Sequence, residues 1–311
     1  MKQGFKGTSL ANLCSWFGVT RQAYYQSKKR VHKNLCKEET LVTEVKNIRK
    51  LHRRMGGRKL LDKLNPFLND HRLSIGRDAF FDLLRYNSLL VKPRKSYHKT
   101  TRSNHWMRKY PNLIKDIKPM GPNHIWVSDL TYWKSKERYY YISFITDAYS
   151  RKIVGYQVAD NMEAIETLEA LKMAMKTLKP GHSGLIHHSD RGSQYCSSQY
   201  VSALKKKKIQ ISMTENGDPL ENAIAERLNG IIKGEYLFDY NIESLHHAKS
   251  VLKAVVNLYN NDRPHASLNN ALPSEIHENQ VAIEVKRLWK NYYNKDLKLS
   301  QENEMCKPIS G

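Results

Sequence analysis

The sequence predicts a mixed α/β domain preceded by an all-α, strongly basic half. Three runs rich in aromatic and β-branched residues follow one another over 123–160, and helical and strand patterns then alternate, which is typical of a mixed sheet. Before residue 96 the patterns are helical. Residues 1–120 contain 28 Lys and Arg against 8 Asp and Glu, whereas the rest of the chain contains 24 against 22. This asymmetry indicates that the first half binds a polyanion, most simply nucleic acid.

Composition narrows the class of protein further. The 311 residues suggest two or more domains, and a hydrophobic content of 40% is enough for a core. The four cysteines form no CxxC pair, which disfavours a disulfide framework or a zinc ribbon and fits a reducing cytoplasm. No apolar run is long enough for a signal peptide or a membrane span, so no membrane partner is expected.

Residues 1–33 have the outline of a helix-turn-helix. Leu10, Leu13 and Trp16 suit the inner face of a first helix, and a turn follows at 17–19. Thr20 is placed to cap a second helix with a polar start, the kind that enters a major groove, although a plain helical hairpin remains the alternative. The candidate DNA contacts of this unit are Arg21, Gln22 and Lys28.

A second helix-turn-helix unit is predicted at 38–95. An amphipathic helix runs to Gly56-Gly57, two further helical patterns follow, and the unit ends in the basic stretch "VKPRKSYHKTTR". That positive tail suits a path along the phosphate backbone. Residues 96–118 have the composition of a basic linker. The candidate DNA contacts here are Arg58, Lys59, Arg77, Lys92, Arg94 and Lys95.

The predicted catalytic core spans 119–279. Strands are expected at 124–133, 138–150, 151–160, 184–190 and 209–213, and helices at 162–178, 198–208, 221–236 and 245–261. The last segment, 280–311, is a polar tail without an assignment.

Three carboxylates of this core stand out by position. Asp129 interrupts an apolar strand on the face of Ile125 and Val127, which is costly for an unpaired charge. Asp190 ends a buried strand, where α/β folds place their sites, although a turn or cap residue explains it equally well. Glu226 lies on the helix at 221–236, opposite its apolar stripe, where a solvated side chain is the plainer interpretation. The spacing favours a joint role, because 35 residues separate Asp190 from Glu226.

These three residues resemble the DDE triad of the transposase and retroviral integrase superfamily. The chain is most similar to insertion-sequence transposases of the OrfB type, from the IS-three family, and the similarity covers most of its length. The stretches that carry it are "CSWFGVTRQAYY", "MGGRKL", "PNHIWVSDLTYW", "ITDAYSRKIVGY", "HHSDRGSQY", "ENAIAERLNGIIKGEY" and "YNNDRPHASLNNALPSEI".

The resemblance implies an RNase H-like core, a mixed five-stranded sheet with flanking helices. It implies that Asp129, Asp190 and Glu226 are catalytic and bind two Mg²⁺ ions, with Mn²⁺ as a substitute. Oxygen-only ligands suit these cations, which relieve the repulsion among the carboxylates and assist in-line attack at a phosphodiester. The chain would then be a DNA transposase that cleaves and transfers strands at terminal inverted repeats and joins them to target DNA. A homo-oligomer and an OrfA-type partner are expected with it, and the resemblance implies a bacterial cytoplasm in which the chain lies on the nucleoid.

Two other functions compete with this hypothesis. A non-catalytic DNA-binding protein, such as a domesticated relic of a transposase, shares the same basic half, and a ribonuclease H shares the same core chemistry. The intact triad argues against the first, and the long DNA-binding half argues against the second.

Residues around the triad have weaker predicted roles. Lys233 and Asn222 fall on the same side of the helix as Glu226 and are candidate DNA contacts, and His188 is a candidate support for Asp190. Trp133 is assigned to the core or to base stacking, Asp147 to a structural pair with Arg151, and Arg263 and His265 to phosphate contacts.

Overall fold

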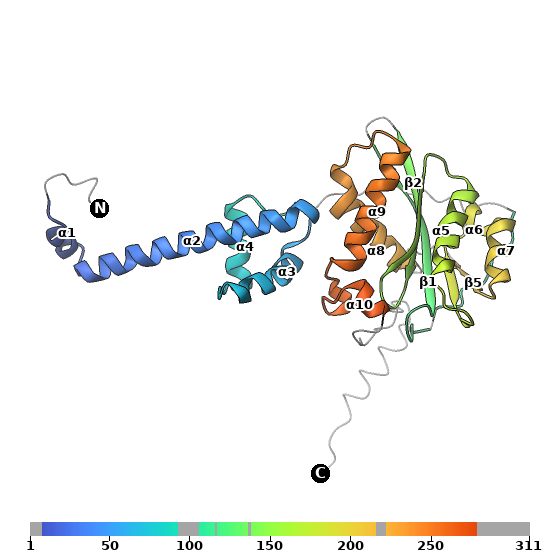
Figure 1. Cartoon of the computed structure of the whole chain (residues 1–311), viewed down its shortest axis with the longest axis horizontal. Coiled ribbons are helices and arrows are strands. Elements are labelled where there is room, and N and C mark those ends of the chain that lie inside the picture. The colour runs from blue at the N-terminus through green and yellow to red at the C-terminus, as the bar shows by residue number, and fades with distance from the viewer. Residues whose placement is uncertain (1–7, 93–105, 116, 136–137, 216–221, 279–311) are drawn as a thin grey trace, which may run out of the picture. The chain divides into compact units, whose positions relative to one another are not determined.

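The computed structural model describes residues 8–92, 106–115, 117–135, 138–215 and 222–278, with the backbone alone at 30–34. The chain divides into two compact units, Met1–Pro93 and Arg94–Gly311, and each is described by itself (Figure 1). The predicted DNA contacts Arg94 and Lys95 and the tail 280–311 lie outside the described residues.

The first unit opens with the predicted helix, turn and helix. Helix α1 (Leu10–Trp16) is followed by a turn in which Gly18 has φ +63°, and Thr20 caps α2 (Arg21–Leu51) by accepting a hydrogen bond from the Ala23 amide at 3.0 Å. This start of α2 and its cap agree with the sequence prediction. The predicted inner face is wrong in one place, because Trp16 is 67% exposed while Leu13 is buried.

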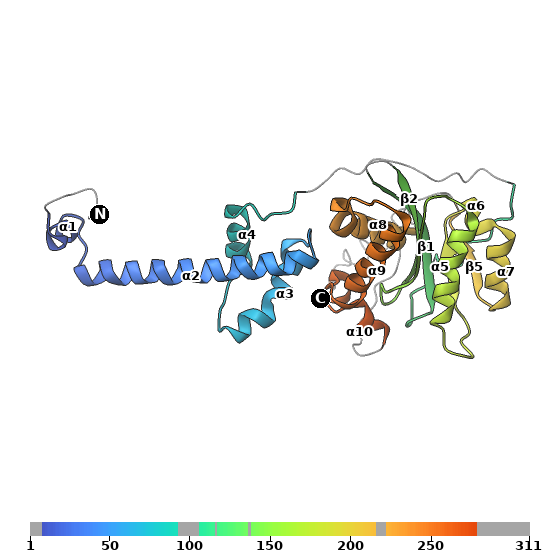
Figure 2. The same cartoon turned by 45° about the horizontal axis from the view of Figure 1, so that its top comes forward.

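The two predicted helix-turn-helix units are not separated at 33–38. Helix α2 is continuous over 31 residues, and no glycine or proline interrupts it between the two expected units. Its C-terminal half packs with α3 (Gly57–Asp70) and α4 (Arg77–Tyr86), as Figure 2 shows. Leu41, Val45, Leu60, Leu64 and Phe80 form the centre of this small core. A single long helix therefore connects the N-terminal turn to the three-helix core.

The second unit is built on a five-stranded mixed sheet in the order β3-β2-β1-β4-β5. Strands β1 (Ile125–Lys134), β2 (Tyr139–Asp147) and β3 (Ile153–Ala159) form an antiparallel meander, and β4 (Ile186–Ser189) and β5 (Gln210–Met213) extend it in parallel from β1. All five expected strands are present, and the mixed five-stranded sheet confirms the predicted fold class. The pairing of β4 with β1 covers only Ile125–Ser128.

Helices cover both faces of the sheet (Figure 1). One face carries α5 (Ala164–Lys176), α6 (Ser193–Cys196) and α7 (Ser198–Lys206), packed around Trp126 and Ile145. The other carries α8 (Ala223–Ile231) and α9 (Leu245–Asn261). A short helix, α10 (Pro273–His277), contacts α9.

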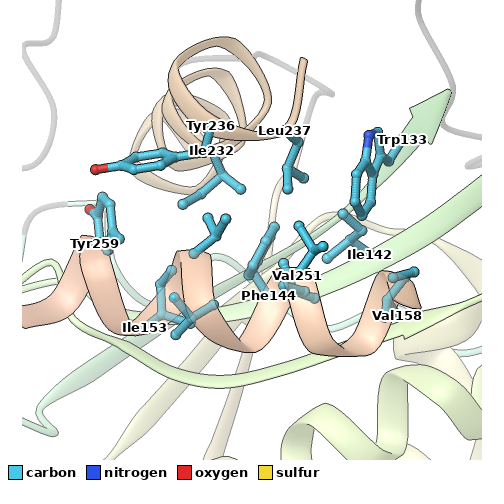
Figure 3. Close-up of a cluster of buried hydrophobic side chains, with 14 of the residues drawn as sticks. Trp133, Ile142, Phe144, Ile153, Val158, Ile232, Tyr236, Leu237, Val251 and Tyr259 are labelled. Carbon is cyan, nitrogen blue, oxygen red and sulfur yellow. The ribbon is translucent and has the colours of Figure 1, made fainter. Parts of the chain in front are cut away.

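The core on the α8 side continues beyond α8 into an irregular segment. A π-helical turn (Ile232–Tyr236) and a 3₁₀ turn (Leu237–Asp239) follow α8, and their apolar side chains pack with Phe144 and Val251, as Figure 3 shows. Trp133 is 4% exposed in the same cluster, which favours the core assignment over base stacking. The π turn thus anchors the end of the helix that carries Glu226.

The predicted linker at 96–118 differs from the structure in its second part. Ile114 is fully buried with Ile125 and Ala225, and the amide of Leu113 donates to Ser212 Oγ at 2.9 Å. Met107 and Tyr110 pack against the α5 side of the core. Apolar residues among the lysines of this stretch explain the difference, because they bury against the catalytic core.

Among the described residues no helix combines the length and apolar character that a membrane crossing requires.

Gly155 gives a test of how tightly the sheet packs on α5. A β-carbon at this position would lie 2.2 Å from the carbonyl oxygen of Ala170, in the backbone of the helix that covers β3. We expect Gly155→Ala to lower the free energy of unfolding by about 1–3 kcal/mol, because backbone has to move to make room. Gly230→Ala is the matched control, since that helical glycine has open space around it and alanine favours helix. Equal melting temperatures for the two variants would contradict the packing described here.

Candidate active site

The three predicted carboxylates come from three separate elements around β1. Asp129 lies in β1 directly after the part paired with β4, Asp190 follows the last residue of β4, and Glu226 is in the first turn of α8. Asp129 and Asp190 are half-buried and Glu226 is exposed. The parallel pairing of β1 with β4 sets Ser128 opposite Ser189, so the two aspartates follow paired residues at the same end of the pairing.

The Asp129 carboxylate is held by two hydrogen bonds. Its Oδ1 accepts from the Leu130 amide at 2.9 Å, and its Oδ2 accepts from Asn229 Nδ2 at 2.7 Å. Asp190 Oδ1 accepts from the Gly192 amide at 3.0 Å, which closes the turn between β4 and α6. Both aspartates therefore have fixed carboxyl orientations.

The electrostatics show that the three acids influence one another. Burial and, after it, the charges of Asp190 and Glu226 raise the pKa of Asp129 to about 8, although its hydrogen bonds from Leu130 and Asn229 act in the opposite direction. Asp190 and Asp129 also contribute to raising the pKa of the Tyr195 phenol, which burial alone already raises. The site thus concentrates negative charge in a partly desolvated place.

Helix α8, with its N-cap Asn222 and the π turn that follows it, is attached to β1 by three side chains that bind successive parts of the strand. Asn222 Nδ2 donates to the Ser128 carbonyl at 3.0 Å, Asn229 Nδ2 to Asp129, and Lys233 Nζ to Thr131 Oγ1 at 3.1 Å. The predicted row of Asn222 and Lys233 is therefore present, but it faces the strand. Asn222 is buried and bonded to the backbone of β1, and its contact with DNA stays a prediction.

Asn229 is a residue of the candidate site that the sequence patterns did not predict. It lies on α8 three residues after Glu226 and four before Lys233, so it continues the same helical row. This helical periodicity was the sequence signal that could have placed Asn229 in the site. An asparagine within a helix is ordinary in composition, and only the structure shows that its amide binds a carboxylate of the triad.

Lys233 lies beside the acids and against an aromatic ring. Its Nζ is 4.3 Å from the centre of the Tyr132 ring, and partial burial lowers its pKa while the Asp129 charge raises it. A lysine at this place is positioned for a phosphate near the triad.

His188, which was predicted to support Asp190, and Asp147, which was assigned a structural role, are both buried and hydrogen-bonded within the fold. His188 is fully buried and its Nδ1 is 2.8 Å from Ser212 Oγ on β5. Asp147 is fully buried and accepts hydrogen bonds from the Asn123 and Ser150 amides, which agrees with its structural assignment, although these groups bind its carboxylate where Arg151 was expected.

Arg263 is not a phosphate contact in the described conformation. Its side chain is fully buried, and its Nε and Nη2 donate to the two carboxylate oxygens of Glu235 at 2.7 Å each. The pair fixes Glu235 within the π turn that carries Lys233. The spacing of 28 residues hid this interaction from sequence reasoning.

The predicted DNA contacts of the first unit are on its surface. Arg21, Gln22 and Lys28 are exposed on the first turns of α2, Arg58 and Lys92 are exposed, and Lys59 is half-buried. Arg77 is exposed and forms an ion pair with Asp78 at 2.9 Å. These residues are accessible, and their contact with DNA stays a prediction.

The carboxylate set fits a divalent cation by its chemistry. It offers only oxygen ligands, and the repulsion that raises the pKa of Asp129 is the kind that a bound cation relieves. Within the described part of the chain, however, no group of three His, Cys, Asp or Glu side chains is already arranged to hold a metal ion. Binding would require the carboxylates to draw together, and Asn229 is the group that now occupies Asp129 Oδ2.

Comparisons with known proteins identify relatives of this chain. Two models described as "Integrase core domain" match residues 119–219 and 207–273. An insertion element IS600 protein of 31 kDa from Shigella sonnei is 34% identical over 86% of this chain and 97% of its own length. The transposase of insertion sequence element IS904 from Lactococcus lactis is 30% identical over 70% of this chain and 92% of its own.

Solved structures include a similar chain as well. The catalytic core domain of HTLV-2 integrase, in complex with magnesium, matches 51% of this chain and 99% of its own length with 24% identity and a TM-score of 0.41.

The raised pKa of Asp129 predicts a pH dependence of stability without added metal. Between about pH 4 and pH 8 the folded state binds more protons at Asp129 than the unfolded chain, whose carboxyl has the ordinary value of 3.8. The contribution of this residue to the free energy of unfolding therefore falls as the pH rises through that window and is constant above it. We expect Asp129→Asn to flatten the fall in melting temperature between about pH 5 and pH 8 in EDTA.

Two further variants should move the same transition in opposite directions. Glu226→Gln removes one repelling charge and lowers the pKa of Asp129, whereas Asn229→Ala removes a donor to the carboxylate and raises it. If Asp129→Asn reproduces the wild-type pH profile, Asp129 is ionised in the folded protein and the assignment is wrong.

Proposed function

Because the chain belongs to the integrase-core transposases of insertion sequences, of the IS-three family, we propose that it binds the terminal repeats of its element and cleaves and transfers DNA strands with Asp129, Asp190 and Glu226. The observation that carries the proposal is the convergence of three acids from β1, β4 and α8. Asp190 and Glu226 both act electrostatically on Asp129, and folding alone requires no such concentration of charge.

These three carboxylates would hold magnesium, as one ion or two, with manganese as a substitute. When bound, a divalent cation lowers the pKa of water and offsets negative charge at a phosphodiester. The protein contributes the fixed orientation of Asp129 by Leu130 and Asn229, and the Lys233 ammonium beside it for a DNA phosphate. A hydroxyl of water or of a DNA 3′ end would attack the phosphorus, the P–O bond in line with it would break, and the displaced DNA oxygen would leave as a hydroxyl after taking up the proton that the attacking group loses. No protein nucleophile is needed.

The partners follow from this chemistry. The basic surface of the first unit, with Arg21, Lys28 and Arg58 exposed, suits double-stranded DNA, both the terminal inverted repeats and the target. A homo-oligomer would hold the two ends of an element together, and an OrfA-type partner would add to the same assembly.

The test of catalysis is the substitution Asp190→Asn. The variant should bind DNA that carries the terminal repeats as the wild type does, whereas Mg²⁺-dependent cleavage of a labelled end should fall by about a hundredfold or more. Asp160→Asn is the matched control, because this aspartate is exposed on the same unit outside the triad, and it should retain cleavage. Full cleavage by Asp190→Asn would end the proposal, and binding without any cleavage by the wild type would identify a non-catalytic DNA-binding protein.

The test of DNA binding is its salt dependence. Each phosphate neutralised adds roughly 0.9 to the slope of log K against log salt. We expect the full chain to show a steeper slope than residues 94–311, which keep the segment from Met107 that packs on the core. The measurement is fluorescence anisotropy with a labelled duplex at several salt concentrations. An unchanged slope would show that the first unit does not contact the phosphates.

A further inference from the structure

From Asp129 onward, the edge of β1 that faces β4 has no paired strand in the described part of the chain. Strand β4 pairs with Ile125–Ser128 only, so in the described part of the chain no strand covers the β4-side edge of β1 from Asp129 to Lys134. Strand β2 pairs with the opposite edge over its whole length. Beyond Ser128 this edge of β1 is approached by side chains such as Asn229 and Lys233 and not by a strand of the described sheet.

Two tyrosines and two lysines gather at this end of β1. The Tyr132 and Tyr139 rings meet edge to face with 5.9 Å between their centres, on adjacent antiparallel strands. Lys233 Nζ lies 4.3 Å from the centre of the Tyr132 ring, and Lys134 Nζ lies 5.8 Å from the centre of the Tyr139 ring. We call these four residues the tyrosine platform.

The platform is not part of the hydrophobic core. The neighbouring aromatics Trp133 and Tyr140 are buried in the cluster with α8 and α9, whereas Tyr139 is 47% exposed and belongs to none of the buried clusters. Single exposed aromatics are common on proteins. Here two aromatic rings and two ammonium groups are placed together beside a site rich in carboxylates, which core packing does not explain.

The chemistry of the platform matches a nucleotide whose base is unpaired. An aromatic ring offers its face to any base, and a nearby ammonium binds the phosphate of the same strand. Within a duplex the faces of the bases are covered by their neighbours, so the exposed Tyr139 ring suits a base that has left the stack. Lys233 connects the platform to the triad, because its ammonium donates a hydrogen bond to Thr131 and also lies over the Tyr132 ring.

We propose that the tyrosine platform binds an unpaired nucleotide of the DNA strand being processed, with the base on Tyr139 and the phosphates on Lys134 and Lys233. The proposal rests on the proposed function. Tyr139 is paired with Lys134, which lies five residues beyond Asp129 in β1. Residues of a strand are about 3.3 Å apart, so Tyr139 lies roughly 17 Å along β1 from Asp129, a distance of about five base steps. The site would thus hold the strand open about five nucleotides from the scissile phosphate.

The experiment uses the full chain and a forked duplex whose unpaired arm is made of thymidines with one 2-aminopurine. Calcium replaces magnesium to prevent cleavage. Wild-type protein should quench 2-aminopurine at one arm position and should prefer the forked duplex to a blunt one. Tyr139→Ala should remove the quenching and reduce the preference by roughly fivefold to a hundredfold, the loss of one base–aromatic stack.

Three variants separate stacking from other effects. Tyr139→Phe keeps the ring and should retain the quenching, whereas Tyr139→Leu keeps apolar bulk without a ring and should lose it. Tyr86→Ala is the matched control, because Tyr86 is 89% exposed on the other unit. Melting temperatures confirm that each variant is folded.

The outcomes distinguish this proposal from the proposed function. If Tyr139→Ala quenches as the wild type does, or if blunt and forked duplexes are bound equally, the platform does not bind an unpaired base, even where Asp190→Asn abolishes cleavage. If the wild type quenches but never cleaves DNA with Mg²⁺, the platform stands and the proposed catalytic function fails.

Discussion

The attachment of α8 to β1 is the constraint on which the site depends. Asn222, Asn229 and Lys233 bind Ser128, Asp129 and Thr131, so the helix follows the strand across one short stretch. Each such bond contributes about 1 kcal/mol, and somewhat more where the partner is charged. Glu226 itself is exposed, and the bonds of Asn222 and Asn229 on either side of it hold this part of the helix beside the two aspartates.

The same attachment places opposing effects on the ionisation of Asp129 at the centre of the fold. The amide of Asn229 favours the ionised form of Asp129, while burial and the charges of Asp190 and Glu226 favour the protonated form and prevail. Fold stability alone would be better served by an apolar residue at this position. A site that carries such a cost is typical of places where a positive charge binds during function, and the neighbouring Lys233 supplies only part of that charge.

The sequence predicted well those elements that local patterns determine. It predicted poorly those elements whose geometry depends on side chains far away in the sequence. The five strands and the cap at Thr20 followed from periodicity and residue type. The π turn at 232–236 could not be predicted, because its geometry is linked to the Glu235 carboxylate, whose partner Arg263 lies 28 residues away. The triad was identified by spacing and resemblance, whereas Asn229 required knowledge of which helical face meets the strand.

The buried ion pair of Glu235 and Arg263 fixes the π turn that carries Lys233. A fully buried guanidinium is costly unless a carboxylate satisfies it, and here both of its bonds to Glu235 are 2.7 Å long. The pair therefore specifies one conformation of the π turn. That turn sets Lys233 against Thr131 on one side and the Tyr132 ring on the other. Lys233 consequently connects the carboxylates with the tyrosine platform. Its position is fixed by the Glu235–Arg263 ion pair, which includes neither a carboxylate of the triad nor a tyrosine of the platform.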